Sequence, residues 1–362
     1  MKKDLEYWLS LSLINNLNNH LKLEALSIFG SPRNILKAHK EALLRAGFTS
    51  DNYEALHSQY IKDEANRILE YCQKNKIKIL TLNDEEYPEL LKFIYDPPMV
   101  LYVRGTIPKL NAVAMVGSRK ASGYGIETAV KLSSQLALAG ILVVSGMARG
   151  IDTASHCGAM KEERPTVAVL GCGVDITYPP ENQSLMERII EYGAVVSEFP
   201  PGTRPAPYNF PSRNRIISGM SSGTVVVEAG LKSGSLITAK YALEQGREVF
   251  AVPGNINLLN SQGTNMLIKD GAKIVLNVED ILEELNFGIA PIVSNRSDIL
   301  YSESLNEKHK KIIAALKIED LYDEELSNKI SVPLDELYEL LLDLELKGIV
   351  KKSITGRYML IA

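Results

Sequence analysis

The sequence has little cysteine, few histidines and no long apolar run, and each shortage excludes a class of protein. Cys72, Cys157 and Cys172 are too few and too widely spaced for a disulfide framework or a Cys-x-x-Cys metal site, which predicts a reducing, cytoplasmic compartment. The five histidines are too dispersed for a metal cluster. No stretch approaches the roughly 18 apolar residues of a membrane span, and the early Asp4 and Glu6 disfavour a signal peptide. We expect no membrane association and no metal or other cofactor.

Positive charge is not in excess either. Lys and Arg number 40 against 44 Asp and Glu, which gives a net charge of −4. The molecule as a whole is therefore not a polycation, and any nucleic-acid site must be a local patch. The 45% hydrophobic and 23% charged content is typical of a globular protein and excludes a disordered one. At roughly 150 residues per domain, the length predicts one large domain with one or two smaller modules.

The apolar pattern divides the chain into four parts. Residues 1–72 show helical spacing and predict a small helical domain. Residues 73–288 alternate short apolar runs with helix-length segments, which predicts a doubly wound, extended Rossmann-like α/β domain. Residues 289–303 are rich in Ser, Asn and Pro without apolar periodicity and predict a linker. Residues 304–362 read as helices followed by a two-stranded wing, the order of a winged helix.

Nine apolar runs predict the strands of a parallel sheet covered on both faces. They are Ile77–Leu82, Met99–Val103, Ala112–Val116, Ile141–Ser145, Thr166–Leu170, Ala194–Ser197, Thr224–Glu228, Glu248–Val252 and Lys273–Leu276.

The run at 112–116 leads into a glycine-containing loop and then a helix. A helix N-terminus offers unpaired N–H groups and a positive dipole end, and glycines let an anion approach the backbone. The spacing is not Gly-x-Gly-x-x-Gly, and no acidic residue ends the next strand, so NAD binding is disfavoured. A glycine turn needed only for packing is the alternative. The residues that we predict to bind phosphate here are Gly117, Ser118, Arg119, Lys120, Gly123 and Gly125.

Acidic residues are missing from two stretches that carry cations, between Asp96 and Glu127 and between Glu198 and Glu228. Loops that follow parallel strands converge at one sheet edge, so these stretches are predicted to form a single cationic crevice. Phosphate polymers bind such crevices.

In the second stretch, Ser212 looks like an N-cap that places Arg213 and Arg215 in the first turn of a helix. The two arginines point about 200° apart, so we expect one of them to bind an internal carboxylate. Tyr208 and Phe210 offer rings on which bases of a single strand can stack. For Phe210 a place in the core is the equal alternative.

A third glycine- and serine-rich turn follows the run at 224–228. Ser235 is predicted to cap the next helix while Ser233 and Gly234 present N–H groups to an anion. Glu228 ends the strand and is either a general base or, as we favour, a structural partner of Arg213 or Arg215.

Asp152 and His156 lie one helical turn apart in the sequence. An Asp and a His at this spacing serve as a helix cap and a packed side chain more often than as a catalytic dyad.

With these stretches in view, the chain resembles the DNA-processing protein A (DprA, also called Smf) family of bacterial recombination mediators. The matching segments, in chain order, are Val116–Arg119 with Gly123–Gly125, Ser145–Asp152 with His156, Gly171–Gly173, Ser197–Glu198 with Pro201–Gly202, Phe210–Ile217, Ser222–Thr224 with Glu228, Ser233–Ser235 with Thr238–Ala239, and Gly246–Arg247 with Ala251–Gly254.

The resemblance implies an extended Rossmann domain that binds single-stranded DNA, forms a homodimer and helps to load the RecA recombinase during natural transformation, without enzymatic activity. It implies an N-terminal sterile-alpha-motif-like domain and a C-terminal winged helix. The DNA-binding role passes by motif position to Arg119, Phe210, Arg213, Arg215 and Lys240.

Two features complicate this assignment. From Asp298 onward, 13 acids stand against 9 Lys and Arg, so duplex phosphates would repel this part, and we expect a protein contact or a structural role for it. The Ser-Gly-Thr…Glu pattern that ends at Glu228 also resembles the strand and turn of nucleotide phosphoribohydrolases, although their fuller glycine signature is missing. An enzyme that binds a nucleotide in the same crevice is therefore the competing hypothesis.

Overall fold

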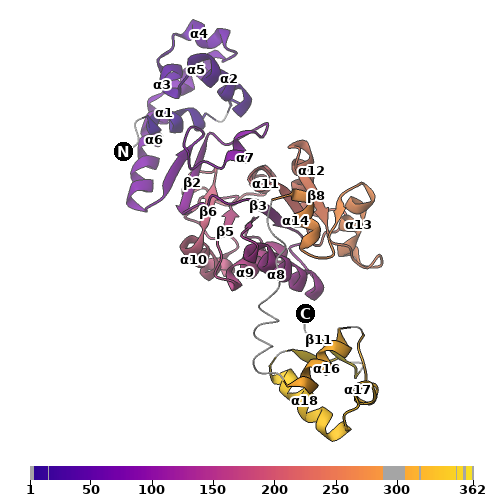
Figure 1. The fold of residues 1–362 in the computed structure, drawn as a ribbon. Helices are drawn as coiled ribbons and strands as arrows, with labels where there is room; N and C mark the ends of the chain where they lie inside the picture. The colour runs from indigo at the N-terminus through magenta and orange to yellow at the C-terminus, as the bar shows by residue number, and fades with distance from the viewer. Residues whose placement is uncertain are drawn as a thin grey trace. The chain divides into compact units, whose positions relative to one another are not determined.

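The structure is a computed structural model that describes residues 4–14, 16–287, 306–317, 319–347, 349–353 and 356–360. The chain divides into two compact units, Met1–Pro291 and Ile292–Ala362 (Figure 1). The predicted linker at 289–303 lies outside the described residues. Across the described ranges, no helix is long and apolar enough to cross a membrane, and no three His, Cys, Asp or Glu side chains are grouped so that they could hold a metal ion.

The first unit begins with six helices. They are α1 (Leu5–Ser12), α2 (Asn19–Phe29), α3 (Pro32–Lys37), α4 (Lys40–Arg45), α5 (Ser50–His57) and α6 (Gln59–Lys74). Short polar side chains fix several of the starts: Asn18, Ser31, Thr49 and Ser58 each accept a hydrogen bond from a backbone amide of the first turn. The buried faces of these helices share one core with strands of the sheet that follows.

A nine-stranded sheet follows, with a strand inside or overlapping each of the nine predicted runs. The strands are β1 (Lys78–Thr81), β2 (Val100–Gly105), β3 (Ala112–Val116), β4 (Leu142–Ser145), β5 (Thr166–Val169), β6 (Ala194–Ser197), β7 (Gly223–Val226), β8 (Glu248–Ala251) and β9 (Lys273–Ile274). Their order in the sheet is β1-β2-β6-β5-β4-β3-β7-β8-β9. The strands from β3 to β7 are buried along their whole length, as the apolar runs predict.

The prediction of a wholly parallel sheet is wrong at one edge. Strand β2 is antiparallel to both of its neighbours, with Thr81 opposite Val100 and Tyr102 opposite Ser197. The connection from β1 to β2 contains only the four-residue helix α7 (Glu89–Lys92). Such a helix rises about 6 Å, too little to carry the chain back along a strand. Apolar runs encode burial but not direction, so the sequence could not show this.

The helices between the parallel strands cover both faces of the sheet (Figure 1). They are α8 (Gly123–Leu138), α9 (Ile151–Lys161), α10 (Gln183–Tyr192), α11 (Asn209–Gly219), α12 (Ser235–Glu244) and α13 (Gln262–Lys269), with 3-10 turns η1 (Pro180–Asn182) and η2 (Leu259–Ser261), and α14 (Glu279–Leu285) follows the last strand. The chain moves outward from β3 to β6 and then returns to place β7 on the other side of β3. In open α/β sheets, ligands bind at the carboxyl ends of the strands where the order reverses, here between β3 and β7.

The described part of the second unit, from residue 306 on, contains three helices and a hairpin. They are α16 (Glu307–Leu316), α17 (Asp323–Ile330), α18 (Leu334–Leu346), β10 (Val350–Lys352) and β11 (Tyr358–Leu360). The two strands are antiparallel, and the helices bury a common cluster that includes Ile312, Leu326, Leu337 and Leu344. This is the element order that the sequence predicts. Gly348 and Thr355, which the sequence places at the end of the last helix and in the hairpin turn, lie outside the described residues.

Candidate nucleic-acid interface

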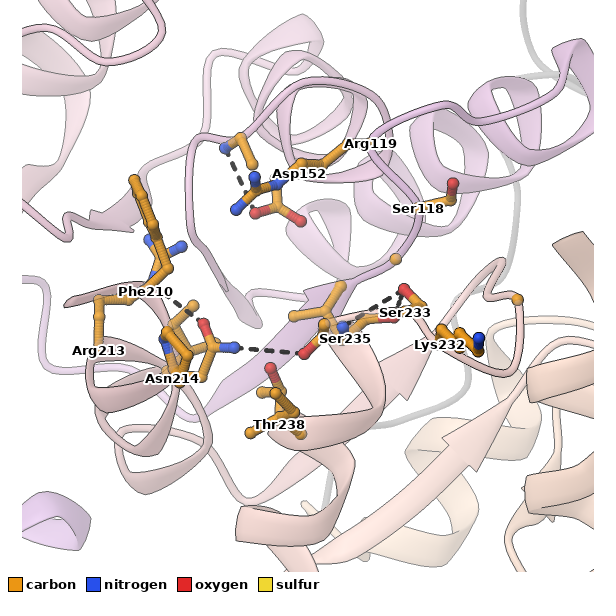
Figure 2. A pocket seen from close by; sticks show the side chains of 18 of the residues that line it. Ser118, Arg119, Asp152, Phe210, Arg213, Asn214, Lys232, Ser233, Ser235 and Thr238 are labelled. Atoms are coloured by element: carbon orange, nitrogen blue, oxygen red, sulfur yellow. Dashed lines mark hydrogen bonds between the residues drawn. The ribbon is translucent and has the colours of Figure 1, made fainter. Parts of the chain in front are cut away.

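A crevice of about 690 Å³ opens at the carboxyl ends of β3 and β7. The loop after β3, the turn before α9, the first half of α11 and the loop into α12 all contribute to it (Figure 2). The two acid-free stretches therefore do line one crevice, as predicted. Its charged lining residues are four cations, Arg119, Lys120, Arg213 and Lys232, and one acid, Asp152.

The loop after β3 is held close to its neighbours by glycine. A side chain on Gly117 would place its Cβ 2.5 Å from the Ile151 side chain, and one on Gly150 would lie 2.2 Å from the Ser118 carbonyl. Gly150 also has a φ of +75°, which disfavours other residues. Close packing therefore accounts for the glycine at position 117. This is the alternative to phosphate binding that the sequence left open. The loop then presents Arg119 and Lys120 to solvent.

The start of α8 is already occupied by an internal anion. Ser122 caps the helix by accepting from the Gly125 amide at 3.1 Å. The carboxylate of Glu228 accepts from the Ser122 hydroxyl at 2.7 Å and from its amide at 3.1 Å. A Cβ on Gly125 would lie 1.9 Å from Glu228 Oε2. The prediction of a ligand phosphate beside Gly123 and Gly125 is corrected here, because the chain supplies its own carboxylate at that position.

Glu228 consequently has a structural role, although not with the predicted partner. Its side chain is only 4% exposed and bonds the cap of α8 rather than Arg213 or Arg215. Its backbone carbonyl accepts from the Ser118 amide at 2.7 Å, which ties the loop after β3 to the end of β7.

Arg119 and Phe210 form the mouth of the crevice. The guanidinium of Arg119 lies 5.2 Å from the centroid of the Phe210 ring. Tyr178, from the loop before α10, lies on the same ring with a centroid separation of 5.4 Å. Phe210 is half-buried, and the Gly171 backbone lies so close that a Cβ there would be 2.9 Å from the ring. The Phe210 ring is thus partly exposed and partly packed against the backbone. This position lies between the two alternatives that the sequence allowed, a stacking surface and a place in the core.

Helix α11 starts earlier than predicted, at Asn209, and Ser212 lies inside it rather than capping it. The Phe-Pro-Ser sequence suggested a helix that begins after Pro211. Proline is accommodated in the first helical turn, so the helix can begin before it. Arg213 and Arg215 therefore lie in the second turn.

Arg213 faces the crevice from the sheet side. It is 3% exposed and donates to the carbonyls of Gly146, at 2.7 Å, and Val169, and to Asn214 Oδ1 at 3.2 Å. Burial lowers the pKa of its guanidinium to about 10, so it stays charged at neutral pH. These carbonyl contacts do not neutralise it, and the crevice has a fixed positive charge at its floor.

Arg215 points away from the crevice, as the angular separation predicts. Its guanidinium binds Glu198 with two hydrogen bonds of 2.7 Å and Asp96 with one of 2.9 Å. These carboxylates hold its pKa above the usual value despite burial. The expectation that one of the two arginines binds an internal carboxylate is confirmed. The DNA-binding role that the resemblance gives Arg215 has no support in this geometry.

The loop into α12 contributes a second set of donors. Lys232 is exposed, Ser233 and Ser235 share a hydrogen bond of 2.7 Å between hydroxyls, and Gly234 occupies the N-cap position. The prediction that Ser235 caps α12 is wrong by one residue. The Ser233 amide donates to the Gly230 carbonyl at 2.9 Å, and the Ser235 amide donates to Ser233 Oγ at 3.4 Å. Among the described residues, no carboxylate binds this helix start as Glu228 binds the start of α8.

Lys240 lies further along α12. Its side chain is 76% exposed, pairs with Glu244 at 3.7 Å and does not line the crevice.

Asp152 and His156 are separate features. Asp152, in the first turn of α9, accepts from the Ala148 amide at 3.3 Å, and burial raises its pKa to about 6. His156 is fully buried, and its Nδ1 is 2.8 Å from the Thr166 hydroxyl. Burial lowers the His156 pKa to about 3, so the ring is neutral. It is a packed side chain, as favoured, rather than half of a dyad.

Sequence reasoning did not single out several polar lining residues, among them Tyr178, Asn214 and Asn260. Asn214 lies within the matching segment Phe210–Ile217, whereas Tyr178 and Asn260 reach the crevice only through the tertiary fold. Only the aromatic character of the Tyr178-Pro-Pro segment, shortly after Gly171–Gly173, offered a clue.

Comparison with known proteins places this geometry in a family. Residues 78–286 match the family described as DNA recombination-mediator protein A. Protein Smf of Escherichia coli is 39% identical over 287 residues, which cover 78% of this chain and 76% of the relative. DNA processing protein DprA of Bacillus subtilis is 42% identical over 222 residues, or 60% of this chain and 75% of the relative.

Two solved structures are also similar. DprA of Streptococcus pneumoniae has a TM-score of 0.64 and 34% identity, and the match covers 77% of this chain and 97% of that one. DNA processing protein A of Helicobacter pylori, described for its single-stranded DNA binding mode, has a TM-score of 0.53 and 28% identity, covering 59% and 98% respectively.

Proposed function

The chain belongs to the DNA recombination-mediator protein A family, and from that premise we propose that it binds single-stranded DNA in the crevice between β3 and β7. The observation that carries the proposal is the charge of this crevice: four cations against one acid, in a chain whose net charge is −4. Local positive charge of this kind attracts a phosphate polymer.

Two kinds of group in the crevice can bind phosphate, exposed cationic side chains and a backbone amide. Arg119, Lys120 and Lys232 are exposed and can follow the phosphates of a flexible strand. The Gly234 amide, at the N-cap position of α12, suits one further phosphate.

A ring surface completes the site. Phe210, supported by Tyr178, offers a face for base stacking, which holds single strands without regard to sequence. Arg213 supplies a buried positive charge below this ring. We assign Gly117, Glu228, Arg215 and His156 to positioning of the loops, and leave Gly123, Gly125 and Lys240 outside the contact surface.

Assembly is part of the proposal. We assign the chain to a homodimer that helps to load the RecA recombinase onto DNA during natural transformation and recombination. Exposed apolar side chains between residues 256 and 276 support a protein interface; they are Ile256, Leu258, Leu259, Met266, Ile274 and Leu276.

The domain assignment is also a proposal: a sterile-alpha-motif-like domain over 1–72, the DNA-binding domain over 73–288, a linker over 289–303 and a winged helix over 304–362. Helix α18 carries five acids, of which Glu336 and Asp343 pair with Lys308 and Lys347. The acids that remain would meet duplex phosphates unfavourably, so we assign this part a protein-binding or structural role.

Nothing in the geometry favours the competing phosphoribohydrolase reading. Such an enzyme needs its carboxylate in contact with the nucleotide, whereas Glu228 is buried and bonded to the cap of α8. The comparison that separates the two readings is incubation with nucleoside monophosphates: release of free base that is lost in Glu228→Ala would favour the enzyme.

Fluorescence anisotropy tests the proposal directly. A labelled 20-nucleotide oligothymidine should bind, and the same length of duplex should compete poorly, because a duplex cannot present a single base to Phe210. Equal competition by duplex would contradict the proposed site. RecA loading is tested separately, by asking whether the protein lets RecA form filaments on strands that are coated with single-strand-binding protein.

A further inference from the structure

Asp152 is the one acid among the described lining residues of the crevice, and a site for phosphate alone has no use for it. Asp152 lies on the first turn of α9 and is 7% exposed, and Figure 2 shows it next to Arg119 at the crevice. The nearest cation by electrostatic influence, Arg213, gives its hydrogen bonds to the Gly146 and Val169 carbonyls and to Asn214. Arg213 and Arg119 attract Asp152 electrostatically, but among the described residues neither arginine donates a hydrogen bond to its carboxylate.

The carboxylate keeps acceptor capacity for a ligand. Its Oδ2 accepts from the Ala148 amide at 3.3 Å, and the Gly146 amide also faces the group. A carboxylate has about four lone-pair positions, so two backbone donors leave roughly half of them available. What fills that capacity must be a donor, because a phosphate oxygen placed there would meet a negative charge at short range.

A single strand offers such donors only on its bases. The crevice, at about 690 Å³, has room for a base beside the Phe210 ring. Among the bases, guanine alone carries adjacent N–H groups, N1–H and the 2-amino group, that one carboxylate can accept together. Thymine has one ring N–H between two carbonyls, and adenine and cytosine set an amino group beside a bare ring nitrogen that a carboxylate repels.

Resting on the proposed function, we propose that Asp152 makes this crevice prefer guanine, by accepting both N–H groups of its Watson–Crick edge. The site then binds the phosphates of the strand without regard to base sequence and selects the base at one position. Asp152 is the specificity-determining residue of that position.

The experiment uses the full chain and short strands that carry one variable base. Twelve-nucleotide oligothymidines with a single central guanine, hypoxanthine, adenine or cytosine compete for a labelled oligothymidine at pH 8. A bidentate contact discriminates by about tenfold, so the guanine strand should bind about tenfold more tightly than the adenine and cytosine strands. Hypoxanthine, which lacks the 2-amino group, should fall between them. Because these comparisons use the parent protein, they do not depend on how any variant folds.

The Asp152→Asn variant then tests whether Asp152 causes the guanine preference. The amide keeps an acceptor for Ala148 and removes one negative charge, so the adenine and cytosine strands should bind more tightly, whereas the guanine strand loses its bidentate contact and the guanine preference disappears. Glu191→Gln, at an exposed acid in α10, controls for the change in net charge and should retain the preference.

The outcomes separate this inference from the function on which it rests. No binding to any strand would overturn the proposed function. Binding with equal affinity for all four bases would overturn the role of Asp152 and leave single-strand binding intact. A guanine preference that persists in Asp152→Asn would place the discrimination elsewhere and equally overturn the assignment.

Discussion

The guanidinium of Arg119 lies 5.2 Å from the centre of the Phe210 ring, so that a cation from the loop after β3 covers a ring from α11. Arg119 follows β3, and Phe210 packs against Gly171, which follows β5. Their contact puts a phosphate-seeking charge and a stacking surface at one place, which is what a single strand requires.

Removing the charge of this pair should weaken binding. Arg119→Ala loses one charge-assisted phosphate contact, for which we expect about tenfold lower affinity for oligothymidine. Arg164 is an equally exposed arginine just before β5, at the opposite edge of the sheet. Arg164→Ala changes the net charge identically and should bind as the parent does. Anisotropy titrations at one salt concentration compare the two, and equal losses would mean that only net charge matters.

Removing the ring tests stacking independently of charge. Phe210→Ala should lower affinity by about 1–3 kcal/mol, the range found for base stacking on aromatic side chains. Phe210→Tyr keeps the ring and should bind almost normally. The salt dependence should be the same in all three proteins, because no phosphate contact changes. If Phe210→Leu matched the phenylalanine protein, bulk rather than stacking would explain the residue.

Arg215 should matter for stability instead of binding. Arg215→Ala leaves the partly buried carboxylate of Glu198 without its partner, and breaking a buried pair costs about 3 kcal/mol or more in the free energy of unfolding. Urea titration measures this loss. The folded protein at low temperature should still bind oligothymidine within about twofold of the parent. A stable variant with lost binding would restore Arg215 to the DNA-contacting surface.

The pKa of Asp152 predicts how stability responds to pH. Burial raises this pKa from 3.8 to about 6, so the folded state holds the proton more tightly than the unfolded state between those values. The contribution of Asp152 to the free energy of unfolding therefore falls as pH rises from about 4 to about 6. His156 acts in the opposite direction, since burial lowers its pKa to about 3 and the unfolded state protonates first.

Comparing the parent with Asp152→Asn isolates the first group. The variant should gain stability relative to the parent as pH rises from 4 to 7, by up to about 3 kcal/mol. Denaturant midpoints at several pH values measure the difference. Parallel curves would show that Asp152 has an ordinary pKa in the folded protein.

Most of the sheet was predictable, because the strands from β3 to β7 are buried runs of four or five residues between loop signals, and apolar composition indicates burial directly. The convergence of two acid-free stretches was predictable for the same reason: loops after parallel strands share an edge. The reversed direction of β2 was not, since an apolar run looks alike in either direction.

The partners of charged residues were the least predictable part of the site. Glu228 and Ser122 are bonded across 106 positions, and Arg215 and Asp96 across 119. Helical geometry could state that Arg213 and Arg215 diverge, but not which of them would meet a carboxylate. Gly123 and Gly125 suggested a site for a ligand anion, because no neighbouring residue in the sequence indicates that Glu228 supplies the anion.

The salt dependence of oligothymidine binding tests the central claim most directly. With about four phosphates neutralised in the crevice, log affinity should fall with log salt concentration at a slope of about −3, and the Arg119→Ala/Lys232→Ala protein should show a slope of about −1.5. A flat slope for the parent, or the parent's slope in the double variant, would contradict the assignment of DNA to this crevice.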